Sequence, residues 1–233
     1  MSSALRLFYH IILPMTDIIT IPGLARRLRI NTIFGIGRNY VAHARELQNE
    51  VPKTPVIFIK PVTTITYSGN NIRLPFQSQD VHFETELVVA IGNTGKNIIV
   101  QEALDYVEGY GIGIDVTARD LQQQAKEKSL PWTVSKGFDT FAPISNFIPA
   151  GEIEDPQQLT FELEVNGQIK QRGDTSKMIF PVAHLISELS HFFTLNPGDL
   201  IFTGTPEGVG PIHSGDQLKA TLSGKTTLEV GVS

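Results

Sequence analysis

Short runs of β-branched and aromatic residues, separated by frequent turns, dominate the pattern of hydrophobic and polar positions in this chain. Its 20 glycines and 14 prolines are spread along the whole sequence, and residues of this kind mark the ends of short strands. We therefore predict a strand-rich α+β protein. The predicted strands are 32–37, 56–59, 87–91, 110–115, 160–165, 169–171, 200–203, 217–222 and 226–230.

Four further segments have the composition or the spacing of helices, and they would cover the strands. The clearest is 182–193, where Ala183, Leu185, Ile186 and Leu189 follow one another at helical spacing. The other predicted helices are 40–47, 102–106 and 118–128.

The dipeptide Asn166-Gly167 separates the alternating segments FELEV and QIKQ. Both residues accept the positive φ angles of a type I′ turn, so we predict a β-hairpin here. The sequence has no internal repeat, low-complexity stretch or linker. Because 233 residues can share one core, we expect a single domain over residues 1–233.

Composition narrows the classes of partner. The hydrophobic fraction of 41% and the charged fraction of 18% are those of a packed globular protein. A net charge of −5, without any basic run, disfavours nucleic acid. The absence of cysteine excludes disulfides, thiolate metal sites and a cysteine nucleophile, and it fits a reducing compartment.

The first nineteen residues are fairly apolar but are interrupted by Arg6, His10, Pro14 and Asp17. No span of about 20 apolar residues remains, so we expect no transmembrane helix. No small-residue cleavage site follows a clean apolar block. We therefore expect a cytoplasmic protein.

The segment HFETELVVAIG places two carboxylates on a strand that is otherwise apolar on both faces. Strand alternation puts Glu84, Glu86, Val88 and Ala90 on one face. The residues on the opposite face are apolar, with the exception of Thr85. Buried carboxylates repel each other and lose hydration unless a cation or hydrogen-bond donors compensate them. A bound metal ion would supply this compensation.

An alternating glutamate pair is also common on half-exposed strands, and the chain contains such a pair for comparison. Glu162 and Glu164 in FELEV alternate with apolar residues that occupy the opposite face. We expect this second pair to face water.

A second strand, GYGIGID, has one face of bare backbone that ends in a third carboxylate. Gly109, Gly111, Gly113 and Asp115 alternate along this face. Glycine weakens a strand, so glycines at alternate positions indicate that another part of the protein packs closely against them. Asp115 could join the two glutamates at a metal ion, or it could simply cap the next turn.

Three carboxylates without thiolates suit a hard cation such as Mg²⁺ or Mn²⁺ better than zinc. Such an ion keeps several coordination positions for water and substrate oxygens.

A candidate base lies in GRNYVAHARELQ, where His43 and Glu46 share a face if residues 40–47 are helical. A carboxylate that binds one ring nitrogen fixes the tautomer and leaves the other nitrogen free to accept a proton. The alternative is an ordinary solvated helix turn. Lys136, by itself, would be read as a surface lysine.

The segment GDLIFTGTPEGVG predicts a strand that leads into a glycine-rich turn. Its backbone N–H groups, with the hydroxyl of Thr203 or Thr205, could bind an anion. No glycine–lysine phosphate loop is present, which disfavours nucleotide binding.

Seven ordered segments resemble the fumarylacetoacetate hydrolase family, and specifically its short acylpyruvate hydrolase/oxaloacetate decarboxylase branch. The resemblance runs from about Phe34 to the C-terminus, whereas residues 1–30 match poorly. The segments are GRNYVAHARE, PVIFIKP, HFETELVVAIG, GYGIGIDVTARDLQ, LPWTVSKGFDTFAP, VNGQIKQRGDTSKMIF and LNPGDLIFTGTPEGVGP.

The resemblance implies a mixed β-sandwich-like roll with peripheral helices, usually a homodimer, that binds Mg²⁺ or Mn²⁺. It also implies roles for individual residues. Glu84, Glu86 and Asp115 fall on metal-ligand positions, Lys136 on a substrate-contacting lysine, and His43 with Glu46 on the dyad of a lid. The motifs that line the site include Arg38, Asn39, Tyr40, Lys60, Gln122 and Thr205.

One departure from the family pattern is Phe83, where some relatives carry a second histidine. This change could alter the fit of the substrate but removes no metal ligand.

We therefore expect an enzyme that cleaves a 3-acylpyruvate to pyruvate and a carboxylate. Oxaloacetate decarboxylation needs the same metal site and enolate stabilisation but no attacking water. Hydratase, isomerase or decarboxylase activity on a 2-oxo acid from aromatic degradation is a third reading. A noncatalytic binding paralogue is the alternative from another class.

Overall fold

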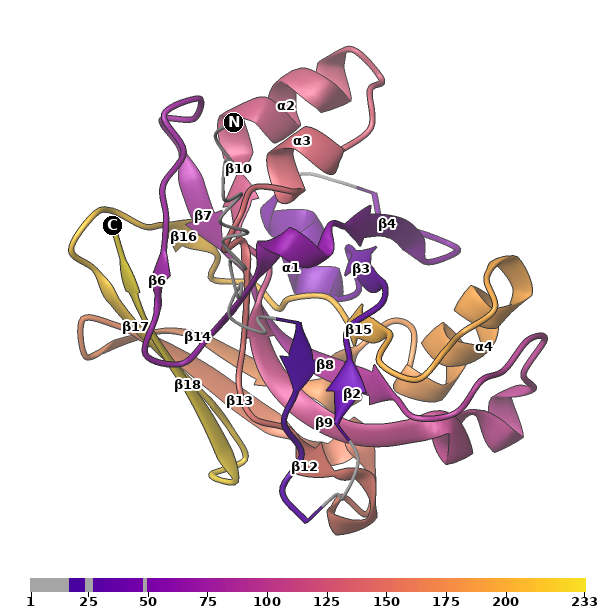
Figure 1. The fold of residues 1–233 in the computed structure, drawn as a ribbon. Helices are drawn as coiled ribbons and strands as arrows, with labels where there is room; N and C mark the ends of the chain where they lie inside the picture. The colour runs from indigo at the N-terminus through magenta and orange to yellow at the C-terminus, as the bar shows by residue number, and fades with distance from the viewer. Residues whose placement is uncertain (1–16, 24–26, 48–49) are drawn as a thin grey trace, which may run out of the picture.

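The computed structural model describes residues 17–23, 27–47 and 50–233. The expectations about the apolar N-terminal stretch fall mostly on residues 1–16, which lie outside this range. Within the described residues the strands form four sheets (Figure 1). This arrangement confirms the strand-rich α+β prediction.

The largest sheet is mixed and carries both strands of the predicted acidic site. Most neighbours are antiparallel, but β15 runs parallel to β3, and β11 runs parallel to β5. In spatial order the strands are β4 (Val56–Lys60), β3 (Ile33–Gly37), β15 (Leu200–Phe202), β8 (Thr85–Ile91), β9 (Val107–Ile114), β11 (Ala142–Ile144) and β5 (Ile65–Tyr67), with β12 (Ile148–Pro149) paired to β9.

A five-stranded sheet contains the predicted hairpin. Asn166 and Gly167 have φ angles of 52° and 75°, as the type I′ turn requires, and β13 pairs antiparallel with β14. The hairpin prediction is confirmed. The strands are, in order, β14 (Gln168–Asp174), β13 (Thr160–Val165), β17 (Gln217–Leu222), β18 (Thr226–Val232) and β6 (Asn71–Ile72).

Two small sheets were not predicted, because strands of two or three residues are too short to show an alternating pattern. Their strands are β10 (Thr117–Ala118), β7 (Val81–Phe83) and β16 (Gly210–Pro211) in one, and β1 (Ile18–Ile19) and β2 (Leu28–Arg29) in the other.

The helices lie at the periphery of the sheets (Figure 1). The predicted helix at 102–106 is a 3₁₀ helix, Val100–Tyr106, rather than an α-helix. The α-helices are α1 (Val41–Glu46), α2 (Arg119–Glu127), α3 (Thr133–Lys136) and α4 (Val182–Phe192). The remaining 3₁₀ turns are Val62–Thr64, Ala150–Glu152, Pro156–Gln158 and Thr175–Lys177.

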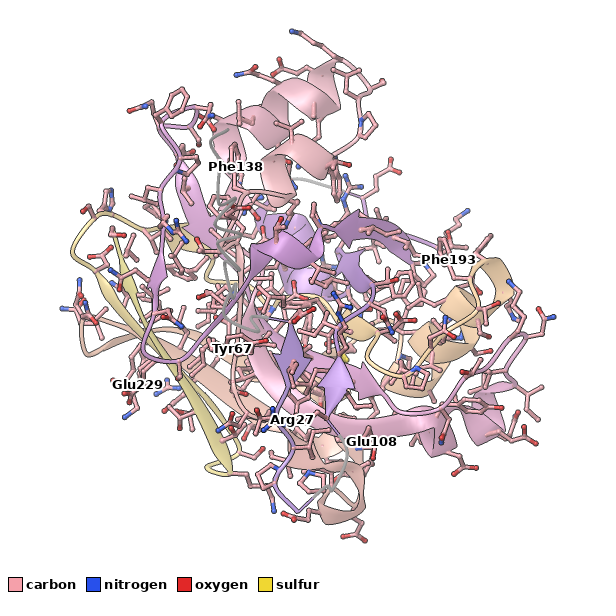
Figure 2. All side chains as sticks on the ribbon, viewed as in Figure 1. Arg27, Tyr67, Glu108, Phe138, Phe193 and Glu229 are labelled. Carbon is pink, nitrogen blue, oxygen red and sulfur yellow. The ribbon has the colours of Figure 1, made fainter. Side chains whose placement is uncertain are left out.

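Helix α4 buries its apolar face in the main hydrophobic cluster, as its helical spacing predicts, and packs against the 3₁₀ helix Val100–Tyr106. Phe193 directly follows the helix (Figure 2). Its ring lies 5.1 Å from the ring of Phe34 in β3. Among the described residues, no helix is long and apolar enough to cross a bilayer.

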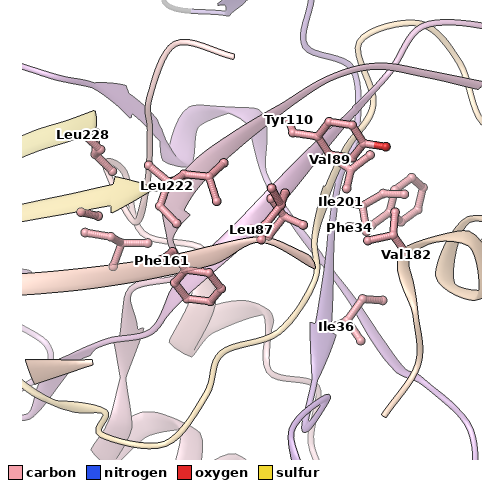
Figure 3. Packing of buried hydrophobic residues seen from close by; sticks show 14 of the residues in the cluster. Phe34, Ile36, Leu87, Val89, Tyr110, Phe161, Val182, Ile201, Leu222 and Leu228 are labelled. Atoms are coloured by element: carbon pink, nitrogen blue, oxygen red, sulfur yellow. The ribbon is translucent and has the colours of Figure 1, made fainter. Parts of the chain in front are cut away.

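Strand β8 is buried on both faces. Leu87 and Val89 belong to the main apolar cluster, which also contains Phe161 of β13 (Figure 3). Val88 and Ala90 point the other way, into a smaller cluster with Phe202. The prediction of a doubly buried strand is confirmed, so any carboxylate at its end lies where hydration is scarce.

The glycine face of β9 is closely packed, as predicted. A Cβ on Gly113 would lie 2.7 Å from Val88 Cγ2 and 2.8 Å from a ring carbon of Phe202. A Cβ on Gly111 would lie 3.2 Å from the ring of Phe147. The bare backbone therefore lets side chains approach the strand that leads to Asp115.

Candidate metal centre

Three carboxylates converge at the ends of β8 and β9. In the ladder Glu86 lies opposite Gly113, and the amide of Asp115 donates a 2.8 Å hydrogen bond to the carbonyl of Glu84. Each of the three carboxylates offers an oxygen, and these atoms all lie within 4.8 Å of one another. All three residues are buried, with 6%, 2% and 1% of Glu84, Glu86 and Asp115 exposed.

Buried cations hold two of these carboxylates. The Lys136 ammonium lies 2.8 Å from Glu84 Oε2 and also donates to Asp115 Oδ2. Lys60 donates to the other oxygen of Asp115, and Arg119 donates to Glu84 Oε1. Lys136 is thus a buried part of the site that pairs with its carboxylates. It is not the surface lysine that its local sequence suggests.

Glu86 has a different environment. Its Oε2 accepts a 2.7 Å hydrogen bond from the amide of Gly204, and no described cation forms an ion pair with it. Burial, together with the charges of Asp115 and Glu84, raises the pKa of Glu86 well above its usual range. This carboxylate therefore lacks a compensating positive charge of its own.

The pKa values of Glu84 and Lys136 shift in the directions that favour their charged forms. Burial would raise the pKa of Glu84, but Lys136 and Arg119 hold it well below its usual range. Burial would lower the pKa of Lys136, but Asp115 and Glu84 raise it. Glu84 therefore stays ionised beside a protonated lysine.

The donor set fits a divalent metal ion. Three buried carboxylate oxygens within one coordination sphere suit a hard cation, and Glu86 lacks a positive partner that such an ion would supply. The convergence that the sequence predicted is confirmed, and Asp115 binds lysines with its carboxylate rather than capping the next turn.

The predicted dyad lies on helix α1. His43 is only 4% exposed, and its Nδ1 lies 3.2 Å from Glu46 Oε2. The other oxygen of Glu46 accepts a 3.0 Å hydrogen bond from the amide of Gly208. Glu46 therefore ties the helix to the glycine-rich turn and fixes one ring nitrogen, which leaves Nε2 available.

A narrow cavity of about 30 Å³ opens in front of the carboxylates. The structure brings most of the predicted residues to its wall. These are Arg38, His43, Glu84, Glu86, Asp115, Gln122, Lys136 and Thr205.

Four predicted residues do not line this cavity, namely Asn39, Tyr40, Glu46 and Lys60. The amide of Asn39 donates to the carbonyls of Phe180 and Thr203 and accepts from the amide of Phe180, so its polar atoms are engaged in bracing loops. Lys60 supports Asp115 from behind. Asn39 and Lys60 therefore support the site from outside the cavity. The sequence motif alone cannot distinguish such a supporting role from contact with the substrate.

The Tyr40 hydroxyl is buried and forms no hydrogen bond with the described part of the protein. Burial, with the nearby charges of Glu86, Asp174 and Glu207, raises the pKa of Tyr40 above its ordinary value. Tyr40 therefore stays neutral at the N-terminal end of α1.

Sequence reasoning missed two residues that shape the site. Arg119 bridges Glu84 and Gln122, since its Nη1 lies 2.7 Å from Gln122 Oε1. Gln171 donates to the Thr205 hydroxyl at 2.9 Å, and Thr205 donates to the carbonyl of Thr85 at 2.8 Å. An arginine four residues after Asp115 was a usable signal, whereas Gln171 lies in a polar strand that gives none.

The geometry and the comparison with known proteins agree. Residues 32–233 match the family described as fumarylacetoacetate (FAA) hydrolase, C-terminal. The chain belongs to this family, and it is an enzyme. Its homologues are enzymes that act on carbon–carbon bonds.

Three relatives are informative. The mitochondrial oxaloacetate decarboxylase of Dictyostelium discoideum is 50% identical over 196 residues, which cover 84% of this chain and 90% of that protein. A mitochondrial oxaloacetate tautomerase of Arabidopsis thaliana is 46% identical over 197 residues, covering 84% and 88%. The crystal structure of fumarylpyruvate hydrolase from Pseudomonas aeruginosa, in complex with Mn²⁺ and pyruvate, has a TM-score of 0.88 and 38% identity, covering 96% of this chain and 98% of that one.

Proposed function

We propose that this enzyme is a Mg²⁺- or Mn²⁺-dependent hydrolase that cleaves 3-acylpyruvates to pyruvate and a carboxylate. The observation that carries the proposal is that the buried His43, which is held by Glu46, lines the same cavity as three converging carboxylates. A hydrolase needs both parts, because one binds the 2-oxo acid end and the other activates water.

Glu84, Glu86 and Asp115 would hold the metal ion. When bound, the ion acts as a Lewis acid toward the carboxylate and 2-oxo oxygens of the substrate. Lys136, which is already protonated beside Glu84 and Asp115, contributes positive charge at the position where negative charge develops on the pyruvate fragment.

His43 acts as the general base. Its Nδ1 faces Glu46, so Nε2 takes a proton from water while the water oxygen attacks the distal carbonyl carbon. The bond between C3 and C4 breaks, its electron pair forms the enolate of pyruvate, and C3 receives the proton. The products are pyruvate and the carboxylate of the acyl group.

Oxaloacetate decarboxylation is a second candidate, favoured by the 50% identical relative of that name. The tautomerase relative points to oxaloacetate as well. Decarboxylation uses the same carboxylates and Lys136 but releases carbon dioxide without an attacking water. The two reactions therefore differ in their need for His43.

The test is an assay of acetylpyruvate, oxaloacetate and a hydroxyhexadienoate with Mg²⁺, using the wild type and His43→Ala. We expect hydrolysis of acetylpyruvate that falls about 10³-fold in the variant, because a general base contributes on the order of 10²–10⁴. His213→Ala, an exposed histidine (side chain 76% exposed), is the matched control. Turnover of oxaloacetate alone, unaffected by His43→Ala, would establish the second candidate instead.

We further propose a homodimer and a cytoplasmic location, from the family resemblance and from the lack of cysteine. Light scattering of the purified protein measures the first. Fractionation of cells tests the second against the mitochondrial location named for two relatives.

A further inference from the structure

Gln171 is a polar residue that the fold buries beside the metal centre, although it does not line the cavity. It lies in β14, where most side chains are exposed, yet only 1% of Gln171 is exposed. Its Oε1 accepts a 3.0 Å hydrogen bond from the amide of Thr85. Its Nε2 donates to the Thr205 hydroxyl at 2.9 Å and to the carbonyl of Pro206 at 3.1 Å. Gln171 therefore joins β14 to the two segments that form the site.

Packing alone does not explain an amide at this position. Gln171 lies directly opposite Leu163 in the β13–β14 ladder, and Leu163 belongs to the main apolar cluster. Burying an amide against such a cluster costs free energy unless its polar atoms are hydrogen-bonded. An apolar side chain would fill the position without that cost, so the hydrogen bonds of Gln171 are what distinguish it from an ordinary core residue.

These hydrogen bonds replace a strand partner at the end of β8. Strand β15 pairs with Val88–Ala90 and does not reach Thr85, and Gly204, with a φ of 97°, turns the chain out of the ladder. The polar backbone groups of Thr85 are held by side chains instead. Gln171 accepts from the amide of Thr85, and Thr205 donates to its carbonyl at 2.8 Å.

The same hydrogen bonds fix Glu86 from both sides. Thr85 directly precedes Glu86, and Gly204 directly precedes Thr205. The amide of Gly204 donates a 2.7 Å hydrogen bond to Glu86 Oε2. Because Gln171 holds Thr85 and Thr205 together, it sets the distance between the backbone of Glu86 and the amide that binds its carboxylate. Partners that orient a metal ligand from outside the coordination sphere contribute about 10–100-fold to metal affinity.

We propose that Gln171 is a positioning residue of the metal centre, which acts through its two threonine partners to orient Glu86. The inference rests on the proposed function, in which Glu86 is a metal ligand. Gln171 itself touches neither the ion nor the substrate. A purely structural role for Gln171 would lower the stability of the protein and leave the metal affinity of the folded protein unchanged.

Titration calorimetry of the folded protein with Mn²⁺ tests this role. Gln171→Met keeps the length of the side chain and removes the hydrogen bonds of the carboxamide, so we expect it to bind Mn²⁺ about tenfold more weakly than the wild type. Gln157→Met is the matched control. The Gln157 carboxamide also joins two backbone groups, the carbonyl of Thr175 at 2.6 Å and the amide of Val182 at 2.8 Å, but it lies outside the cavity. This control should lose stability in urea and bind Mn²⁺ with the wild-type affinity.

A double-mutant cycle tests whether the effect passes through Thr205. Thr205→Val removes the hydroxyl that accepts from Gln171 and donates to Thr85, so it should also weaken Mn²⁺ binding. Combined with Gln171→Met, it should cost about as much as the stronger single substitution, because both remove the same connection. Strictly additive losses would contradict action through Thr205.

Gln171→Asn is a second variant at the same position. Its amide is one methylene shorter and cannot span both threonines, so it should weaken Mn²⁺ binding in the same direction. Wild-type affinity in the Gln171 variants, or an equal loss in Gln157→Met, overturns the inference and leaves the proposed function standing. If the wild type itself binds no Mn²⁺, the proposed function fails, and the positioning role fails with it.

Discussion

The backbone amide of Asp115 donates a 2.8 Å hydrogen bond to the carbonyl of Glu84. Two residues 31 positions apart in sequence are thereby fixed at the same level of the β8–β9 ladder, with Glu86 opposite Gly113. The metal centre is therefore a consequence of strand register, because a slip of one residue would turn the carboxylates to the opposite face.

The register depends on Gly113, so Gly113→Ala should destabilise the protein. The new methyl would lie 2.7 Å from Val88 Cγ2, and overpacking of this kind costs about 1–3 kcal/mol. Urea unfolding measures the free energy. Gly151→Ala is the control, since a Cβ there meets no atom within 4 Å. Equal stability of the two variants would show that β8 and β9 have more freedom than the packing indicates.

Removing a carboxylate from the centre should abolish metal binding. We expect Glu86→Gln to weaken Mn²⁺ binding at least about 100-fold, since even outer ligand partners contribute about 10–100-fold. Titration calorimetry gives the affinity. Glu162→Gln is the control, because the Glu162 side chain is 42% exposed. This variant should bind Mn²⁺ with the wild-type affinity.

The same titration separates the dyad from the metal ligands. His43→Ala should bind Mn²⁺ with the wild-type affinity, because His43 contacts Glu46 and not the three carboxylates. Full hydrolytic activity in this variant would remove His43 from the role of general base.

Much of this site could be predicted from the sequence. Strand alternation correctly placed Glu84 and Glu86 on a doubly buried strand and Glu162 on a more exposed one. The prediction was possible because the apolar residues around each pair indicate whether one face or both faces of the strand are buried. The glycine face that leads to Asp115 was predicted from the glycines at every second position of the strand.

The rest depends on contacts between distant segments. The burial of Lys136 follows from the fold around a short helix, α3, and its local sequence is that of a surface turn. Asn39 braces Phe180 across 141 positions, a contact that no local pattern encodes. The short sheets around β7 and β1 likewise arise from pairing and not from alternation.

The bracing by Asn39 should be important for stability. Asn39→Ala leaves the amide of Phe180 and two carbonyls without their partner, and each unsatisfied buried group costs about 1–3 kcal/mol. We expect a loss of about 3 kcal/mol or more in the free energy of unfolding. Asn93→Ala, which loses one exposed hydrogen bond to the carbonyl of Asp105, should cost less than about 1.5 kcal/mol.

Asp120 should contribute a pH-dependent part of the stability. Burial alone would raise its pKa, but hydrogen bonds from the Ser78 hydroxyl and the amides of Gln79 and Leu121 lower it. Because the pKa is lower in the folded state, the stabilisation is complete above the unfolded value and is lost as the pH falls through the folded value. The difference in unfolding free energy between the wild type and Asp120→Asn should therefore shrink on acidification. A difference that grows toward low pH would contradict this.

The most direct test of the account is the position of a bound metal ion. A crystal of the protein grown with Mn²⁺, measured near the manganese absorption edge, should show an anomalous peak within about 2.5 Å of oxygens from Glu84, Glu86 and Asp115 together. A peak at some other group of residues, with these three carboxylates bound only to Lys60, Lys136 and Arg119, would contradict the assignment of the metal centre.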